Sequence, residues 1–351
     1  MTESAAEAGL PGTSRSTSAT VAPTILRYLA VVASEDGVDL RPLLAEAGLE
    51  EAMLGSPALR VSYRQGAAVI EQAVALTGAE HLGLRVGAAQ GPTSWGLLGF
   101  ALMASDTVEH AITTGVRYQN LSGAMLVWSA GWESDGFVVR VELPDPAVFP
   151  AVAVFLVEEA FASTVAVTRF VLGSRFTPRR VEFALTDPGD AGVFAALFGC
   201  PVVFGAAGNR FVFDPAWARM AVPGRDPVTF ASTLELLDGA MAAGRDRQEL
   251  LELLEVSIAQ SLPIVPSFAE QARRRSASER TLRRRLAECG TTYEQLVDGV
   301  RRERVELLLR RPQLTLREIA HQAGFSDERA LRRAVQRWYG VTPPALRKRL
   351  A

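Results

Sequence analysis

Apolar positions recur with helical period through much of the first half of the chain, and capping residues mark where several helices begin and end. Ser62 and Gln65 form a capping box that opens one helix, and Gly78 ends it. Asp106 and Glu109 are predicted to open another. Up to about residue 200 we expect helices over 22–33, 40–47, 62–78, 106–118, 151–171 and 191–198.

Short runs of β-branched and aromatic residues alternate with these helices, and the pair Asp135–Gly136 between two of them is a hairpin signal. The chain up to about Pro223 is therefore predicted to be an α+β domain, over 21–225. The predicted strands are 125–129, 137–143, 181–185, 202–204 and 210–213.

The first twenty residues are rich in Ser, Thr, Ala and Gly, without a basic start or an apolar run. From this composition we expect no secretory signal peptide and a disordered tail over 1–20.

A helix predicted over 226–244 links this domain to the rest, and Gly244 is expected to end it. Its apolar stripe is made of Phe230, Leu234, Leu237 and Met241. The stripe needs a partner surface, either on its own domain or on the same helix of a second subunit.

From Arg245 to the end almost every element is predicted to be helical, beginning with a helix over 248–261. Two similar helix-turn-helix segments follow, over about 266–287 and 315–338. The helix between them, 292–310, has 19 residues and would span about 28 Å, close to the roughly 34 Å between successive major grooves. Three capping boxes mark helix starts in this region: Ser267 with Glu270, Thr291 with Glu294, and Thr315 with Glu318.

The net charge of −2 hides an asymmetry between these regions. Residues 266–351 hold 20 Arg and Lys against 10 Asp and Glu, a net charge of +10 that leaves −12 upstream. A basic segment on an acidic body suits phosphate neutralisation, although charge alone also fits a solvated surface. The two cysteines, Cys200 and Cys289, are far apart and indicate a reducing compartment.

Catalytic and metal-binding patterns are missing from the sequence. His81, His110 and His321 show no metal spacing, and no GxSxG or phosphate-binding glycine loop occurs. We therefore expect no enzymatic activity, no metal and no cofactor.

Three motifs in the C-terminal region occur together: Ser278–Leu286, Leu316–Ser326 and Arg337–Pro343. Over 245–350 the chain resembles AraC/XylS-type transcriptional regulators. The resemblance implies two helix-turn-helix units that bind double-stranded DNA and act with RNA polymerase. It places the base-reading positions on Arg280, Arg283 and Arg284 in the first unit and on Arg329, Arg332 and Arg333 in the second.

An arginine fork can pair with the guanine edge, but these arginines could instead contact phosphates, water, or Glu279 and Glu288 on their own helix. Arg347 and Arg349 lie beyond the last prolines and are expected to reach phosphates at most. The family pattern is broken where Gln271 and Arg275 replace aliphatic residues, where Ser276 replaces a turn glycine, and where Leu331 and Val335 replace phenylalanines. These changes predict a looser first unit and a smaller second core.

The segments Gly96–Phe100, Ser105–Ala111 and Phe198–Phe204 resemble the regulatory domain of regulators of the ornithine-utilisation type, a domain described as arabinose-binding-like. This resemblance implies that the domain senses a small-molecule effector. Candidate effector-binding residues are Trp95, Tyr118, Trp128 and Glu158.

Each of these candidates has a plainer alternative. Aromatic residues in such a domain are often core. The pair Glu158–Glu159, which interrupts the most apolar stretch of the chain, could face a cationic effector, but a solvated helix edge is the expected position.

Three functions remain open: a cytoplasmic regulator that responds to an effector, a DNA-binding protein whose first domain only dimerises or binds a protein partner, and an enzyme fused to a DNA-binding segment. The sequence favours the first, with a homodimer possible and no membrane anchor expected.

Overall fold

The structure, a computed structural model, describes residues 19–56, 59–143 and 150–350. These residues form two compact units, Thr20–Ala243 and Gly244–Ala351. The first 18 residues of the predicted disordered tail lie outside the described residues, and its last two belong to strand β1. In the parts of the chain that the structure describes, no helix has the length and apolar character that crossing a membrane requires.

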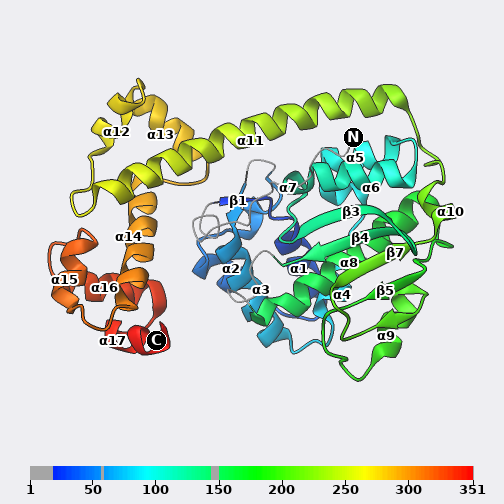
Figure 1. Ribbon diagram of the computed structural model, residues 1–351, viewed down its shortest axis with the longest axis horizontal. Helices are drawn as coiled ribbons and strands as arrows, with labels where there is room; N and C mark the ends of the chain where they lie inside the picture. The colour runs from blue at the N-terminus through cyan, green and yellow to red at the C-terminus, as the bar shows by residue number, and fades with distance from the viewer. Residues whose placement is uncertain (1–18, 57–58, 144–149, 351) are drawn as a thin grey trace. The chain divides into compact units, whose positions relative to one another are not determined.

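The first unit is a mixed α+β domain, in agreement with the prediction (Figure 1). Its helices, with two 3₁₀ turns, are α1 (Thr24–Glu35), α2 (Arg41–Glu46), η2 (Glu51–Met53), α3 (Tyr63–Thr77), α4 (Leu82–Ala88), η3 (Pro92–Trp95), α5 (Leu97–Ala104), α6 (Val108–Arg117), α7 (Gln119–Ser122), α8 (Pro150–Leu172), α9 (Ala191–Phe198) and α10 (Pro215–Ala218). Its strands are β1 (Ala19–Val21), β2 (Val61–Ser62), β3 (Val127–Glu133), β4 (Gly136–Glu142), β5 (Arg180–Glu182), β6 (Val202–Val203) and β7 (Asn209–Phe213).

The main sheet has five strands in the order β3-β4-β7-β5-β6, and every neighbouring pair is antiparallel except β5 and β6. The predicted hairpin is present, but Glu133 pairs with Gly136, so its turn is Ser134–Asp135 and not Asp135–Gly136. The first strand also begins two residues later than predicted and ends at Glu133, because its pairing with β4 continues up to the turn.

Helix α3 begins with the predicted capping box at Ser62 and ends at Gly78 in the left-handed conformation. Helix α6 begins one residue later than predicted. Its N-cap is Thr107 and not Asp106, and the Thr107 side chain accepts from the His110 backbone N–H at 3.2 Å. Asp106 and Thr107 are both good capping residues by type, and the sequence pattern alone does not separate neighbours.

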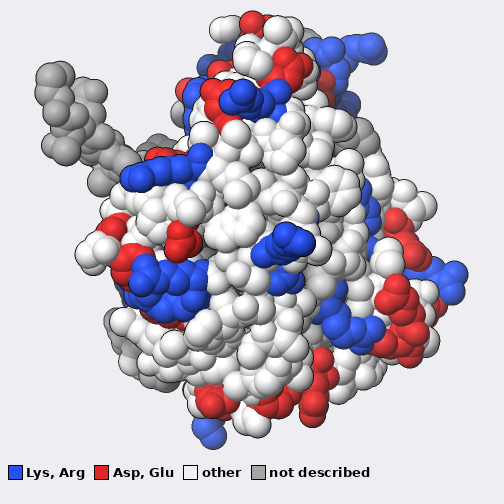
Figure 2. Space-filling model, turned by 90° about the vertical axis from the view of Figure 1, so that its right-hand side faces the viewer, with Lys and Arg blue, Asp and Glu red and all other residues white. Residues whose placement is uncertain are grey.

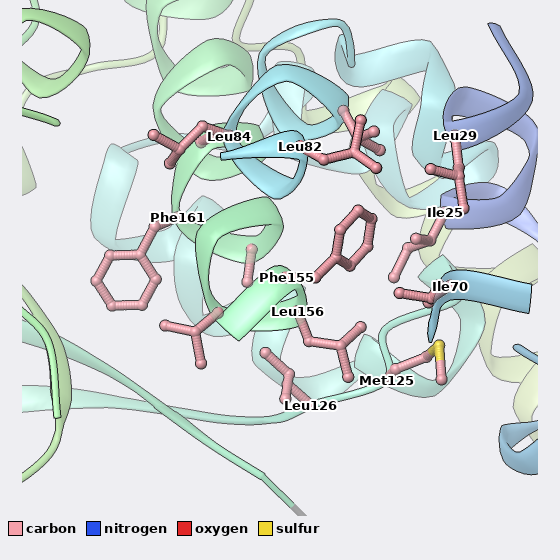
Figure 3. Close-up of a cluster of buried hydrophobic side chains, with 14 of the residues drawn as sticks. Ile25, Leu29, Ile70, Leu82, Leu84, Met125, Leu126, Phe155, Leu156 and Phe161 are labelled. Carbon is pink, nitrogen blue, oxygen red and sulfur yellow. The ribbon is translucent and has the colours of Figure 1, made fainter. Parts of the chain in front are cut away.

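Helix α8 packs against one face of the sheet, and the core of the unit lies between them. Its Phe161 ring stacks on Phe211 at 4.2 Å between centroids and lies 4.7 Å from Phe183. Nearer the start of α8, Phe155 points into a cluster with Ile25 and Leu29 of α1 (Figure 3). Burying aromatic rings of this size supplies much of the stability of such a core.

Helix α4 approaches α8 closely through two glycines. A Cβ atom at Gly83 would lie 2.3 Å from the Phe155 carbonyl oxygen, and one at Gly87 would lie 2.4 Å from that of Glu159. Only glycine permits this contact, which covers the segment of α8 that carries Glu158 and Glu159.

The opposite face of the sheet carries charged side chains in pairs. Arg210 lies 2.7 Å from Glu182, which Arg180 also contacts at 2.7 Å, and Arg140 pairs with Glu133. Charged side chains are sparser on the side of this unit where α9 and α10 lie. Figure 2 shows a broad uncharged area there, with most charges at its margins.

The predicted linking helix and the next predicted helix are one continuous helix, α11 (Pro227–Ser261). The prediction that Gly244 ends a helix is wrong, because one glycine costs about 1 kcal/mol and the flanking residues favour helix. Of the two partners that the sequence left open for the apolar stripe, the structure contains the first. Leu237 is buried with Leu98 and Leu102, and the other stripe residues pack against the same cluster.

The second unit is helical throughout the residues that the structure describes. After the last part of α11 it contains α12 (Phe268–Arg274), α13 (Glu279–Glu288), α14 (Tyr293–Leu309), α15 (Leu316–Gln322), α16 (Glu328–Tyr339) and α17 (Pro343–Leu350).

Two of its three predicted capping boxes are present, at Ser267 and Thr315. The third is wrong by one residue, because Thr292 with Gln295 caps α14 in place of Thr291 with Glu294. Both pairs fit the capping pattern, so the sequence offered two starts for one helix.

Two separate cores lie in this unit, and α14 contributes to both. Leu296 and Val300 of α14 join Leu282 and Leu286 of α13 in the first core. The second core contains Val305, Leu308 and Leu309 of α14 with Ile319, Leu331 and Val335. One helix of 17 residues therefore supports both helix-turn-helix segments.

Candidate nucleic-acid interface and apolar cavity

Helices α13 and α16, the second helices of the two helix-turn-helix segments, each bury one face and expose the other. Leu282 and Leu286 are buried on α13, as are Leu331 and Val335 on α16. The six predicted reading arginines are all exposed and occupy matching positions on the two helices: Arg280, Arg283 and Arg284, and Arg329, Arg332 and Arg333.

These arginines differ in their contacts within the protein. Arg332 pairs with Glu328 at 2.5 Å, and Arg284 lies 3.6 Å from Glu288. The Arg283 guanidinium lies over the Phe268 ring at 5.4 Å. Among the described residues, Arg333 has no ion-pair partner. Exposed i,i+4 pairs are worth only about 0.3–0.5 kcal/mol, so they do not prevent an arginine from turning to a DNA base.

Polar contacts fix α16 against α14. The Asp298 carboxylate accepts from the Trp338 indole N–H at 2.7 Å and from Arg337 at 2.5 Å. Arg301 of α14 donates to the Gly324 carbonyl at 2.5 Å and lies over the Phe325 ring at 5.1 Å. Because α14 holds the turn and the end of α16, the exposed arginines stand on a rigid support.

The unusual residues of the first segment form a buried polar network. Gln271 is fully buried, donates to the Ser257 hydroxyl at 3.1 Å and accepts from Arg275 at 2.5 Å. Burial lowers the pKa of Arg275. The polar pair that replaces two aliphatic residues joins α12 to the last turns of α11, although the buried Nε of Arg275 has no hydrogen-bond partner among the described residues.

Ser276 stands in the turn with a φ of 50°, and Gly324 holds the matching place in the second segment with a φ of 76°. A left-handed serine is strained, whereas glycine is not. We predict that Ser276→Gly stabilises the second unit by about 1 kcal/mol in chemical unfolding of the full chain. Ser276→Ala is the matched control and should bring no gain, and a loss of stability in the glycine variant would contradict the prediction.

Arg347 departs from the sequence-based expectation, because it is half-buried and donates to the Leu314 carbonyl at 2.7 Å. It therefore supports the fold of the second unit, whereas Arg349 is exposed on α17. Pro343 stands at the first position of α17, where proline favours the start of a helix.

The first unit contains a cavity of about 140 Å³ between α6, α8, β3 and the segment around η3. Its walls are almost entirely apolar, with Leu98, Ile112 and Val167 among them. A dry apolar cavity of roughly 150 Å³ holds a molecule as large as benzene. The space therefore suits a compact ligand.

Glu159 is the only ionisable residue among the described residues that line the cavity. It accepts from the Gln90 amide at 2.6 Å, and Gln90 in turn accepts from the Trp95 indole at 3.2 Å. Burial raises the pKa of Glu159 to about 7, against smaller opposing effects of hydrogen bonds from Gln90 and Ser163. The expectation of a solvated edge at Glu158–Glu159 is wrong, because α4 covers both residues.

The four candidate effector-binding residues do not come together. Trp95 and Trp128 line the cavity, whereas Tyr118 and Glu158 are not among its lining residues. Tyr118 is buried and donates to Asp238 at 2.6 Å. The sequence analysis did not select Gln90, and it considered Glu159 only as one of a pair that could face a cationic effector. Nothing in the local pattern shows which of two adjacent glutamates faces a cavity.

Glu158 instead belongs to a second polar cluster around His81. The His81 Nδ1 lies 2.9 Å from Glu158 and its Nε2 lies 2.7 Å from Asp190. Burial alone would lower the pKa of His81, but the hydrogen bonds to two carboxylates outweigh it and raise that pKa. The hydrogen bond to His81 explains why Glu158 can be buried without facing the cavity.

Each of the two units matches a known protein family. Residues 37–222 match the family described as the arabinose-binding domain of AraC transcription regulator, N-term, and residues 271–349 match a helix-turn-helix domain family.

Two relatives are similar over most of the chain. The ornithine utilization regulator of Pseudomonas aeruginosa is 27% identical over 315 residues, which cover 90% of this chain and 92% of that protein. An uncharacterized HTH-type transcriptional regulator of Mycobacterium tuberculosis is 28% identical over 333 residues, which cover 92% of this chain and 95% of the relative.

Among solved structures, the transcriptional regulator CdpR of Pseudomonas aeruginosa is 27% identical, with a TM-score of 0.45 and coverage of 88% of this chain and 96% of that one. The family match over 37–222 spans more than half of the chain, and the helix-turn-helix match covers the exposed arginines of α13 and α16. The chain therefore belongs to the AraC-type transcription regulators, with an arabinose-binding-type domain before a DNA-binding domain of the helix-turn-helix class.

Proposed function

We propose that this chain is a cytoplasmic transcription regulator whose affinity for its operator changes when a small molecule occupies the cavity of the first unit. The observation that supports the proposal is the apolar cavity with a single buried carboxylate, Glu159, in its wall. Apolar cavities with a few placed polar groups are the usual form of small-molecule sites.

The DNA would be held by the two reading helices, α13 and α16. Residues 266–351 carry a net charge of +10, so binding should weaken steeply as salt rises and counterions compete for the phosphates. RNA polymerase would be the second partner of the bound regulator, as the family resemblance implies, and pairing of two chains on one operator is compatible with this arrangement.

The proposal is tested by measuring operator affinity with and without candidate effectors. Operator sites are first selected from random DNA with the full-length protein, and a panel of small metabolites is then screened for compounds that change the dissociation constant. We expect at least one compound to change it by about 5- to 150-fold, the usual size of coupling between two sites.

A variant that fills the cavity gives the matched test. Val167→Phe adds a ring at the cavity wall, whereas Val154→Phe makes the same change at an exposed position of α8. We expect Val167→Phe to bind the operator but to lose the response, and Val154→Phe to keep both. If no compound changes operator affinity and Val167→Phe behaves as the wild type, the first domain acts as a dimerisation or partner-binding module instead.

A further inference from the structure

The polar groups of the cavity wall divide into two kinds. Most of them are already used inside the protein: the Thr164 and Thr168 hydroxyls donate to carbonyls of their own helix, and the Gln119 side chain bonds to the backbone of Trp128. Glu159 is different, because a carboxylate has room for several donors, and Gln90 supplies one of them. A ligand would therefore find an acceptor at Glu159 and little else polar around it.

We propose that the cavity binds a compact amine, with an apolar body about the size of one ring and a single ammonium group that donates to the Glu159 carboxylate. The proposal names the ligand class of the site described above and rests on the proposed function for its regulatory meaning.

Three features of the wall favour an ammonium over other polar groups. A charged donor makes a stronger hydrogen bond to a buried carboxylate than a neutral one does. Trp95 and Trp128 line the same space, and indole rings attract cations. None of the described lining residues is basic, so a ligand carboxylate would have no oppositely charged partner in the cavity.

Binding of an ammonium ion is expected to release the proton that the Glu159 carboxyl holds. Near neutral pH part of the protein holds Glu159 in its protonated form, because its pKa is about 7. An ammonium ion that binds there displaces this proton to solvent and leaves a carboxylate paired with the ammonium. A ligand carbonyl would instead accept a hydrogen bond from the protonated acid and release no proton.

The test uses four probes of nearly the same size on the full-length protein: benzylamine, benzyl alcohol, benzoate and phenylglycine, which is benzylamine with a carboxylate added. Titration calorimetry at pH 7 in two buffers of different ionisation enthalpy gives both affinity and proton release. We expect benzylamine to bind at least about tenfold more tightly than benzyl alcohol, with release of protons, and benzoate and phenylglycine not to bind.

Glu159→Gln keeps the size of the side chain and removes its charge. In this variant benzylamine should lose about tenfold in affinity and its proton release, while benzyl alcohol should bind as before. Glu158→Gln is the matched control on the same helix, outside the cavity, and should keep the preference for the amine. Circular dichroism of each variant establishes that the first unit remains folded.

Several results would overturn the proposal: equal or tighter binding of benzyl alcohol or benzoate, benzylamine binding that Glu159→Gln leaves unchanged, or no binding of any probe. These failures differ from failure of the proposed function. If benzylamine binds as expected but operator affinity does not change, the ligand class stands and the regulatory role falls. If other metabolites change operator affinity while amines do not bind, the regulatory role stands and the ligand class falls.

Discussion

Glu159→Gln is expected to change how the stability of the first unit depends on pH. The Glu159 carboxyl has a pKa of about 7 when folded, raised by burial from its ordinary 4.5. The folded state therefore holds a proton that the unfolded state releases. The resulting stabilisation is fully present below pH 4.5 and is lost as the pH rises through 7, a change on the order of 3 kcal/mol.

Glutamine cannot ionise, so the variant should lack this loss. Between pH 5 and pH 8 the melting temperature of the variant should rise relative to that of the wild type by roughly 6–12 °C. The pKa values of His81 and Glu158 are also raised in the folded protein, and for this reason the wild type and the variant are compared at each pH. Glu142→Gln, at an exposed position of β4, is the control and should follow the wild type. Parallel profiles of Glu159→Gln and wild type would contradict a buried, protonated Glu159.

Local signals predicted much of the fold because they act between near neighbours. The capping box at Ser62 and the glycine at Gly78 bound α3 as predicted, since both depend only on the backbone of that helix. The errors occur where two neighbours carry the same signal, as at Thr291 and Thr292, or where packing outweighs a weak preference, as at Gly244. The family motifs of the second unit predicted its two helix-turn-helix segments, and the structure confirms both.

The cavity could not be predicted from the sequence, and the reason is different. Gln90, Trp128 and Glu159 lie on separate elements, and only the tertiary fold brings them to one wall. The glycines of α4 that permit close contact with α8 are the one sequence feature that bears on it. Even these do not show that Glu158 meets His81 while Glu159 faces the cavity.

Arg333→Ala and Arg284→Ala are expected to weaken operator binding and to relax base preference, each at a different place. Each arginine stands exposed on its reading helix, and a bidentate contact to guanine is worth about 1–3 kcal/mol, or roughly ten- to a hundredfold in affinity. Arg333 has no ion pair to break among the described residues, whereas Arg284 would first leave Glu288, so Arg333→Ala should show the larger effect.

The two effects should fall on base pairs about one helical turn apart. Helix α14 has 17 residues, spans about 26 Å and supports both reading helices, which suits successive major grooves roughly 34 Å apart. Arg349→Ala is the control, because Arg349 is exposed on α17 and not on a reading helix, whereas Arg347 is fixed to Leu314 and is unsuitable. Binding of each variant to a library of operator point variants at fixed salt measures preference position by position. Arg349→Ala should weaken all sequences alike, and the same uniform loss in Arg333→Ala and Arg284→Ala would show that these arginines contact phosphates, not bases.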